Sequence, residues 1–252
     1  MKTLVVANQK GGQSKTTEVF HIGTLASVKQ KKRVLYVDND PQGSLSILIP
    51  SSPGAEGSGM LSSALYEKRK DLVVPEVVNE FVSILRRDKS MLNVRESDIG
   101  NPAENLARIA GDYELCIIDN AGSLGHHVNA SLIAADWLIS PVAVGLLEMA
   151  GLSDLFDYVR EIQNSYNPNL KFMGLLPSKV NPSSPEELAA LEELQEQLGE
   201  LIIPHTLFER ASVKQAIAGR RPVWHSTKGA GHLKAGKEWK AACEFILNKM
   251  GV

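Results

Sequence analysis

Short, predominantly apolar stretches alternate along the chain with longer segments of helical periodicity. The stretches that predict strands are residues 3–7, 33–38, 115–119, 137–142, 172–176 and 201–203. Strands of this kind, separated by helical segments, are typical of βαβ units in which helices cover both faces of a parallel sheet. The pattern therefore predicts an α/β fold, with a mostly parallel twisted sheet flanked by helices on both faces. No internal repeat or composition break interrupts it, so residues 1–252 are expected to form a single domain.

The clearest single helix begins near residue 184. Ser184 and Glu187 have the spacing of a capping box, and Pro185 occupies the first helical position, where no N–H is needed. Leucines follow at 188, 191, 194 and 198, and Gly199 can end the helix. We expect the leucine stripe to pack against the sheet and the glutamates opposite to face solvent.

A candidate phosphate-binding loop follows the first predicted strand. Residues 10–17 read Lys-Gly-Gly-Gln-Ser-Lys-Thr-Thr. A strand that ends in a glycine turn and continues as a helix directs several backbone N–H groups at one point, which suits a polyphosphate. Lys15 is then placed to neutralise the β- and γ-phosphates, and Thr16 to place a hydroxyl on Mg²⁺. The candidate nucleotide-binding residues of this loop are Lys10, Gly11, Gly12, Gln13, Ser14, Lys15, Thr16 and Thr17.

The loop departs from the general pattern G-x-x-x-x-G-K-[ST] at both glycines, where Gln9 and Ser14 stand. A Cβ at such a turn costs of order 1 kcal/mol or more when the turn is strained or crowded. We therefore expect Ser14 to lower the affinity for nucleotide, unless its hydroxyl donates to a phosphate oxygen.

Three aspartates stand at the ends of two predicted strands. An unpaired carboxylate at Asp119 carries a large desolvation cost, which coordination to Mg²⁺ would relieve. Asp38 and Asp40 share one face if their strand continues, so both are candidates to serve the metal and the attacking water. The alternative is a turn closed by Asx hydrogen bonds before Pro41, which explains one aspartate better than two. Because ligands bind beyond the carboxyl ends of parallel strands, Gly11, Asp38 and Asp119 are expected to converge on one site.

Four segments, in order along the chain, resemble the ParA/MinD family of ATPases. Residues 10–17 are similar to its deviant Walker A loop, Lys-Gly-Gly-x-Gly-Lys-Thr-Thr, and Lys10 occupies the place of its signature lysine. Residues 33–43 resemble its second motif, an apolar strand ending in D-x-D-P-Q-G, and residues 115–119 resemble its Walker B strand. A fourth segment resembles the family's C-terminal stretch. Its matching residues are Ile203-Pro204, Ser212-Val213, Ala216, Gly219 and Pro222-Val223.

This resemblance implies a P-loop NTPase fold, ATP and ADP with Mg²⁺ as cofactors, and a homodimer that holds nucleotide between its subunits. In such a dimer Lys10 reaches across to the nucleotide of the other subunit, and the second aspartate of D-x-D, Asp40, is tied to water activation. Lys10 and Asp40 are therefore the candidate catalytic residues. The implied metal-site residues are Thr16, Asp38 and Asp119, and Pro204 is implied at the nucleotide.

The resemblance also implies a biological role. ParA-type members help to segregate or position a plasmid or chromosome, bind DNA non-specifically as ATP-bound dimers, and meet a centromere-binding, ParB-like adaptor protein that stimulates hydrolysis. An alternative is a non-hydrolysing adaptor of the same fold. It is motivated by Ser14 and by Asn120-Ala121-Gly122, which stands where the family usually has Thr-Pro-Pro, and by Ala143-Val144-Gly145 after the next strand. We expect a looser loop at residues 120–122, where the γ-phosphate is sensed, and slow or absent hydrolysis.

Charge is distributed unevenly along the chain. The net charge is −2 and the pI about 6.3, which does not indicate a protein that is basic throughout. The C-terminal part is locally basic, and a basic face binds DNA non-specifically through release of counterions from the phosphates. A solvated helical face is the alternative, and the family resemblance favours DNA. The candidate DNA-binding residues are Arg210, Lys214, Arg220, Arg221, Lys234 and Lys237, which outnumber the nearby Glu209, Glu238 and Glu244.

A MinD-like membrane role is a further alternative. The last predicted helix carries a short apolar stripe, of a kind that binds a membrane surface or, more often, packs against a sheet. Its members are Trp239, Ala242, Phe245, Ile246 and Met250. Glu238 and Glu244 weaken the membrane interpretation, so membrane binding is not expected.

Composition adds bounds on compartment and redox chemistry. Hydrophobic residues make up 43% of the chain and charged residues 22%, both ordinary values for a soluble globular protein. No apolar run approaches the roughly 18 residues of a membrane-spanning helix, and no signal peptide opens the chain, so we expect a cytoplasmic protein. Cys116 and Cys243 are too few for a disulfide framework or an iron–sulfur site and are expected to be small buried hydrophobes.

Overall fold

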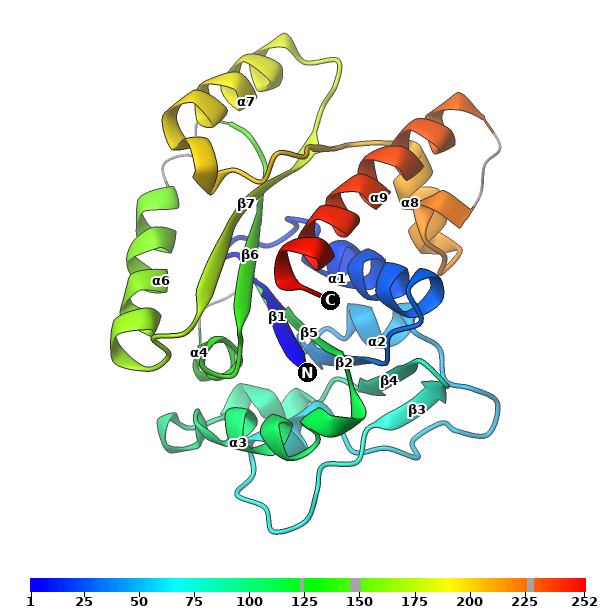
Figure 1. Cartoon of the computed structure of the whole chain (residues 1–252), viewed down its shortest axis with the longest axis vertical. Helices are drawn as coiled ribbons and strands as arrows, with labels where there is room; N and C mark the ends of the chain where they lie inside the picture. Colours follow the sequence, from blue (N-terminus) through cyan, green and yellow to red (C-terminus); the bar gives the residue numbers. More distant parts are fainter. Residues whose placement is uncertain (123–124, 146–150, 226–228) are drawn as a thin grey trace.

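One sheet organises the chain, of which the computed structural model describes residues 1–122, 125–145, 151–225 and 229–252. In these residues the strand order is β3-β4-β2-β5-β1-β6-β7-β8 (Figure 1). The strands β3 and β4 pair antiparallel, and every other neighbouring pair in this order is parallel. The bounds are β1 Lys2–Val6, β2 Val34–Asn39, β3 Glu76–Asn79, β4 Val82–Leu85, β5 Leu115–Asn120, β6 Trp137–Val142, β7 Lys171–Val180 and β8 Leu207–Phe208.

Five of the six predicted strands are present, as β1, β2, β5, β6 and β7. The prediction for residues 201–203 is wrong. Only an isolated bridge between Leu175 and Ile202 and one hydrogen bond, from Ile203 N to Leu175 O at 2.8 Å, join this segment to β7. Pro204 follows and has no N–H to donate, so the pairing does not continue. The strands β3, β4 and β8 were not predicted, because strands of two to four residues carry little apolar periodicity.

Helices cover both faces of the sheet, as the sequence predicts (Figure 1). One face carries α3, α4, α6 and α7, and the other carries α1, α2, α8 and α9. The bounds are α1 Lys15–Thr24, α2 Ser44–Leu48, α3 Asn101–Arg108, α4 His126–Ile133, α6 Leu152–Ser165, α7 Pro185–Leu198, α8 Ala211–Ala218 and α9 Ala230–Met250. A short 3-10 segment, Val223–His225, lies between α8 and α9.

The central strands feed two separate cores, one on each face. In β5, Cys116 and Ile118 belong to the core under α3, α4 and α6, while Leu115 and Ile117 belong to the core under α1 and α9. Side chains of a strand alternate between faces, so each strand that is buried on both sides serves both cores. The same alternation places Asp119, at the end of β5, on the face that α1 and α9 cover.

Three predictions about helix ends and burial are confirmed. Ser184 caps α7, since its side-chain oxygen accepts from Glu187 N at 3.2 Å, and Gly199 ends the helix with a φ of 51°. On α9 the predicted apolar stripe is largely buried, with Trp239 3% exposed, and it packs in the core together with residues of α1. Cys116 and Cys243 are also buried. Within the described residues no helix is long and apolar enough to cross a membrane.

Candidate functional site

The loop between β1 and α1 has the geometry of a phosphate-binding turn. Gly12 and Ser14 have left-handed φ values of 75° and 68°, and α1 begins at Lys15, with Ser14 as its N-cap. A Cβ at Gly12 would meet no atom within 4 Å, so its glycine is required by the backbone conformation and not by crowding. Ser14 adopts the same backbone region with a Cβ, which is the strain expected from its place in the motif.

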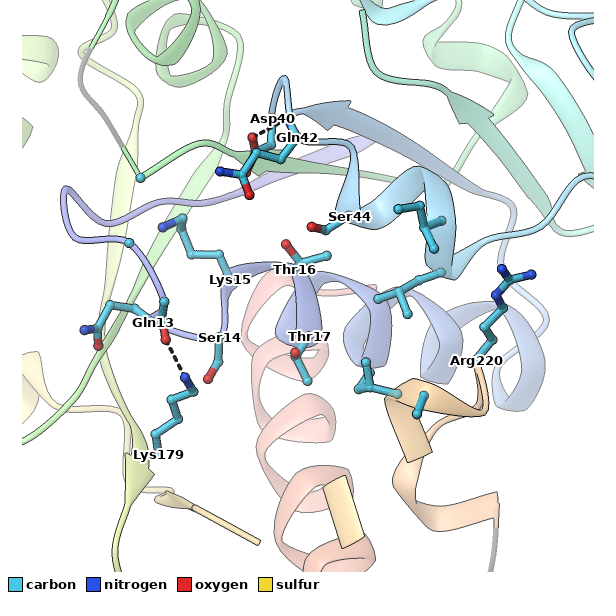
Figure 2. Close-up of a pocket in the computed structure, with 17 residues that line it drawn as sticks. Gln13, Ser14, Lys15, Thr16, Thr17, Asp40, Gln42, Ser44, Lys179 and Arg220 are labelled. Atoms are coloured by element: carbon cyan, nitrogen blue, oxygen red, sulfur yellow. Dashed lines mark hydrogen bonds between the residues drawn. The ribbon is translucent and has the colours of Figure 1, made fainter. Parts of the chain in front are cut away.

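This loop lines a pocket of about 690 Å³ at the carboxyl ends of the strands (Figure 2). The volume lies within the range typical of small-molecule sites, roughly 300–1,000 Å³. Of the predicted site residues, those that line it are Gly11, Gly12, Gln13, Ser14, Lys15, Thr16, Thr17, Asp40 and Arg220. The structure thus brings the predicted phosphate loop and Asp40 together.

Lys15 is 7% exposed and is held by the loop itself. Its Nζ donates to the carbonyls of Lys10, at 3.0 Å, and Asn8, at 3.4 Å. Burial lowers the pKa of Lys15, while the charges of Asp119 and Asp40 oppose that shift. Among the described residues, the Lys15 ammonium donates to carbonyl oxygens alone. Phosphate oxygens can replace such neutral partners of a desolvated cation at little cost.

Asp38 and Asp119 lie side by side in register on the face of the sheet that α1 covers. Asp119 is fully buried, and both of its carboxylate oxygens are without a hydrogen-bond partner among the described residues. Burial, and then the charge of Asp38, raise the pKa of Asp119 well above its usual range, while the nearby Thr16 hydroxyl opposes the shift. An orphaned buried carboxylate beside a pocket hydroxyl fits the oxygen ligands that Mg²⁺ prefers.

Asp38 has partners of its own. Its carboxylate accepts from Ser46 N at 2.7 Å, from Ser46 Oγ at 2.6 Å and from Asp40 N at 3.3 Å, and it therefore anchors α2 to the end of β2. Desolvation raises the pKa of Asp38, and the bonds from Ser46 oppose that shift. The metal role of Asp38 stays a prediction, and a metal would share this carboxylate with Ser46.

Asp40 lies one residue beyond the end of β2, so it does not continue the strand face of Asp38. Its Oδ1 accepts from Gln42 N at 2.8 Å, which is the Asx turn of the alternative interpretation. Asp40 still lines the pocket, opposite Lys15 and Thr16 (Figure 2). The turn and the proposed role with water are therefore compatible at Asp40.

The expected loose loop at residues 120–122 begins later than the sequence suggested. Asn120 is the last residue of β5 and points to the opposite face, where its Oδ1 accepts from Asn39 at 2.6 Å and Ser131 at 3.0 Å. Asn120 is therefore structural, because alternation along the strand turns it away from the loop. Gly122 lines the pocket, and a Cβ there would come within 2.9 Å of Gly11 Cα, so glycine allows the two loops to touch.

Of the predicted nucleotide and metal residues, four are outside the pocket lining: the buried Asp38 and Asp119, and also Lys10 and Pro204. Pro204 is exposed on the segment before β8. Lys10 lies in the loop, where its N–H donates to Asn8 Oδ1 at 2.8 Å and its carbonyl accepts from Lys15. The assignments of Lys10 and Pro204 to the site remain predictions.

The candidate DNA-binding residues differ in their surroundings, and their role stays a prediction. Arg210 forms two hydrogen bonds to Glu238, at 2.7 and 2.9 Å, and Lys214 pairs with Glu209 at 2.6 Å. Arg220 lines the same pocket as the loop at residues 10–17. The remaining three, Arg221, Lys234 and Lys237, are exposed, as are Lys214 and Arg220. A sequence count of charges cannot see such pairing, since the partners are as far apart as positions 210 and 238.

Sequence reasoning missed Lys179, near the end of β7. Its Nζ donates to Gly12 O at 2.6 Å, and its side chain lines the pocket. The signal was present, because ligands bind beyond the carboxyl ends of strands and Lys179 follows a predicted strand. Asn8 and Gln13 also tie the loop to the end of β6, through Asn8 Nδ2 to Pro141 O at 2.6 Å and Ala143 N to Gln13 Oε1 at 2.7 Å.

A family model of an AAA domain matches residues 1–172, which contain the loop, β2 with its aspartates, and β5. The chain belongs to the ParA/MinD family of P-loop ATPases. This ParA/MinD-family chain is 29% identical over 259 residues to protein IncC of Escherichia coli, covering all of the chain and 70% of IncC. It is 27% identical over 237 residues to maintenance of carboxysome distribution protein A of Gloeothece citriformis, covering 86% of the chain and 87% of the relative.

Solved structures share the fold of this ParA/MinD-family ATPase. The ATP complex of a Cyanothece McdA variant has a TM-score of 0.81 at 22% identity, over 98% of the chain and 96% of McdA. Cobyrinic acid a,c-diamide synthase from Mycobacterium smegmatis, with an ATP analog and magnesium, has a TM-score of 0.77 at 23% identity, over 100% and 96%. A plasmid partition protein from Borrelia burgdorferi has a TM-score of 0.75 at 19% identity, over 98% of both chains.

Proposed function

We propose that the chain is a ParA-like ATP-binding partition protein that helps to segregate or position a plasmid or chromosome. The observation that carries the proposal is a single pocket in which a glycine turn, a desolvated Lys15 and Asp40 face one another (Figure 2). Family membership supports ATPase chemistry, and the names of the relatives, IncC, McdA and plasmid partition protein, support positioning as its use.

ATP and ADP bind with their phosphates over the turn. The N–H groups of the loop and the N-terminus of α1 take the phosphate oxygens, and Lys15 exchanges its two carbonyl partners for them. Thr16, Asp38 and Asp119 are the residues that would hold Mg²⁺, because Asp119 is a buried carboxylate without another partner among the described residues. Bound Mg²⁺ supplies charge neutralisation at the phosphates. Asp40 lies at the pocket wall, where it is placed to orient an attacking water.

The active form is a homodimer that binds DNA without sequence preference. In it Lys10 contacts the nucleotide of the second copy, and a ParB-like adaptor protein stimulates hydrolysis. Local cations at Arg221, Lys234 and Lys237, all exposed, supply the phosphate contacts. The apolar stripe of α9 is occupied by packing against α1, which favours DNA over a MinD-like membrane surface. Localisation to the nucleoid in the cytoplasm follows from the same proposal.

A nucleotide-dependent adaptor that does not hydrolyse ATP is the second candidate. The left-handed Ser14, with a φ of 68°, is the observation that favours it, because backbone strain in the loop opposes the geometry that holds phosphate.

The deciding experiment is titration of the purified chain with ATP and ADP in the presence of Mg²⁺, followed by phosphate release with and without DNA. Saturable, Mg²⁺-dependent binding with DNA-stimulated release supports the ATPase. Binding without release supports the adaptor. Absence of nucleotide binding would overturn both. DNA gel shift against liposome co-sedimentation then separates the partition role from the membrane role.

A further inference from the structure

Strained backbone gathers at the candidate pocket. Apart from glycines, the described residues with left-handed φ are Ser14 (68°), Lys31 (57°), Lys179 (60°) and Arg220 (50°). Three of these four line the pocket, and only Lys31 lies outside its lining. A side chain in this backbone region carries a cost, and it persists where the surrounding structure holds it. The clustering therefore indicates a constraint imposed by the site.

Lys179 reaches the loop from the other side of the pocket. It is the ninth of the ten residues of β7, it is exposed, and its Nζ donates to the carbonyl of Gly12 at 2.6 Å. In Figure 2 the side chains of Lys179 and Lys15 lie on opposite sides of the loop segment that carries Gln13 and Ser14. The two lysines therefore contact carbonyls of the loop from opposite sides.

The hydrogen bond from Lys179 has a direct geometric effect on the phosphate site. In a planar trans peptide the C=O and the following N–H point in opposite directions. A hydrogen bond that draws Gly12 O toward Lys179 therefore turns the N–H of Gln13 away from Lys179, toward the side where Lys15 lies. Loop N–H groups that point to that side are the ones available to phosphate oxygens.

We propose that Lys179 is a positioning residue for nucleotide binding, which holds the peptide between Gly12 and Gln13 in the orientation that presents its N–H to phosphate. The part of this inference that concerns nucleotide affinity rests on the proposed function. Lys179 also offsets the departure at Ser14. Glycine adopts the left-handed turn without cost, whereas Ser14 favours relaxation of the turn, and the charged hydrogen bond opposes that relaxation.

The test is a double-mutant cycle with a matched control. Lys179→Asn removes the ammonium but keeps a residue type that tolerates left-handed φ, and it is made in the wild type and in Ser14→Gly. Lys31→Asn makes the same change at the left-handed lysine outside the pocket, and Lys179→Arg restores a cation. We expect Mg-ATP affinity to fall about tenfold in Lys179→Asn, the size of one charge-assisted hydrogen bond, and about twofold when Ser14→Gly is also present.

A second readout needs no nucleotide. Backbone amide chemical shifts of Gly12, Gln13 and Ser14, recorded by NMR without ligand, should move in Lys179→Asn, return toward wild type in Lys179→Arg and stay unchanged in Lys31→Asn. Equal affinity losses in both backgrounds, or unmoved loop shifts in Lys179→Asn, would overturn the inference. If the wild type binds no ATP, the proposed function fails, and the loop shifts alone still decide the role of Lys179.

Discussion

Cations gather in two regions of this chain, the loop at residues 10–17 and the C-terminal stretch from Arg210 to Lys237. In the loop, the side chain of Lys15 is buried and bonded to backbone carbonyls a few residues away. In the C-terminal stretch, Arg210 is paired with Glu238, while Arg221 and others are exposed. The turn of the loop and the start of α1 depend on neighbours in sequence, so the motif predicts them. The C-terminal residues are arranged by tertiary contacts, so their number does not predict a surface.

The largest expected effect is in the loop. Lys15→Ala should lower Mg-ATP affinity at least 100-fold, because no other loop side chain supplies a buried cation to the phosphates and the turn is already strained at Ser14. Lys234→Ala removes a lysine from the C-terminal stretch and is the matched control, with affinity expected to stay within about twofold. Titration with a fluorescent ATP analog measures both. Similar affinities for Lys15→Ala and the wild type would remove the loop from the site.

Turnover separates Asp40 from the residues that only bind. If the chain hydrolyses ATP, Asp40→Ala should lower phosphate release about 10²–10⁴-fold, as expected for loss of a group that orients and deprotonates water. Nucleotide affinity should change little, since the turn, Lys15 and Thr16 are untouched. Phosphate release and ATP titration on the same preparation give the comparison. Equal turnover would leave Asp40 with its Asx turn as its only role.

His21 links the two regions and predicts a pH dependence of stability. Val223 N donates to its Nε2 at 3.0 Å, so the proton is on Nδ1, which donates to Thr17 O at 2.7 Å. Burial lowers the pKa of His21 to about 4, against 6.5 for the exposed group. The folded state therefore holds the neutral ring. Its contribution is fully present above pH 6.5 and is lost as pH falls from 6.5 to about 4, by about 3 kcal/mol.

Chemical denaturation from pH 7.5 to 4.5 measures this dependence, with His21→Gln as the variant that lacks the titrating ring. His225, which is exposed, supplies the control His225→Gln. The pH slope attributable to His21 should disappear in His21→Gln and persist in His225→Gln. An unchanged slope in His21→Gln would assign the acid sensitivity to other groups.

The smallest expected effect concerns two neighbouring arginines, which we expect to act on different ligands. Arg221→Glu should weaken binding to all DNA sequences alike and flatten the log–log salt slope by roughly 1, the value for one phosphate contact. Arg220→Glu should instead lower ATP affinity, because Arg220 lines the pocket. Gel shifts over a salt series and ATP titrations on both variants test the division. If both reversals leave DNA affinity and its salt slope unchanged, the C-terminal stretch is a solvated face and the adaptor gains support.

Much of the site could be predicted because its parts are local or periodic. The glycine turn, the start of α1 at Lys15 and the cap of α7 at Ser184 depend on residues within one turn of chain. The shared face of Asp38 and Asp119 follows from strands that end in the same register. The same alternation predicts that the Asn120 side chain lies on the face opposite to that of Asp119. The sequence analysis missed this because it treated residues 120–122 as one loop.

The sequence alone therefore determined the α/β fold, the phosphate loop and the aspartates at the ends of β2 and β5. Tertiary structure decided which distant side chains line that pocket, namely Lys179 from β7 and Arg220 from the turn after α8. It also decided that Arg210 forms an ion pair with Glu238. It also decided that residues 201–203 make only a bridge, since Pro204 ends the pairing. The physical reason is distance along the chain. Hydrogen bonds and periodicity within a turn or strand depend on residues that are adjacent in sequence. A contact between positions 12 and 179 forms only when the sheet assembles.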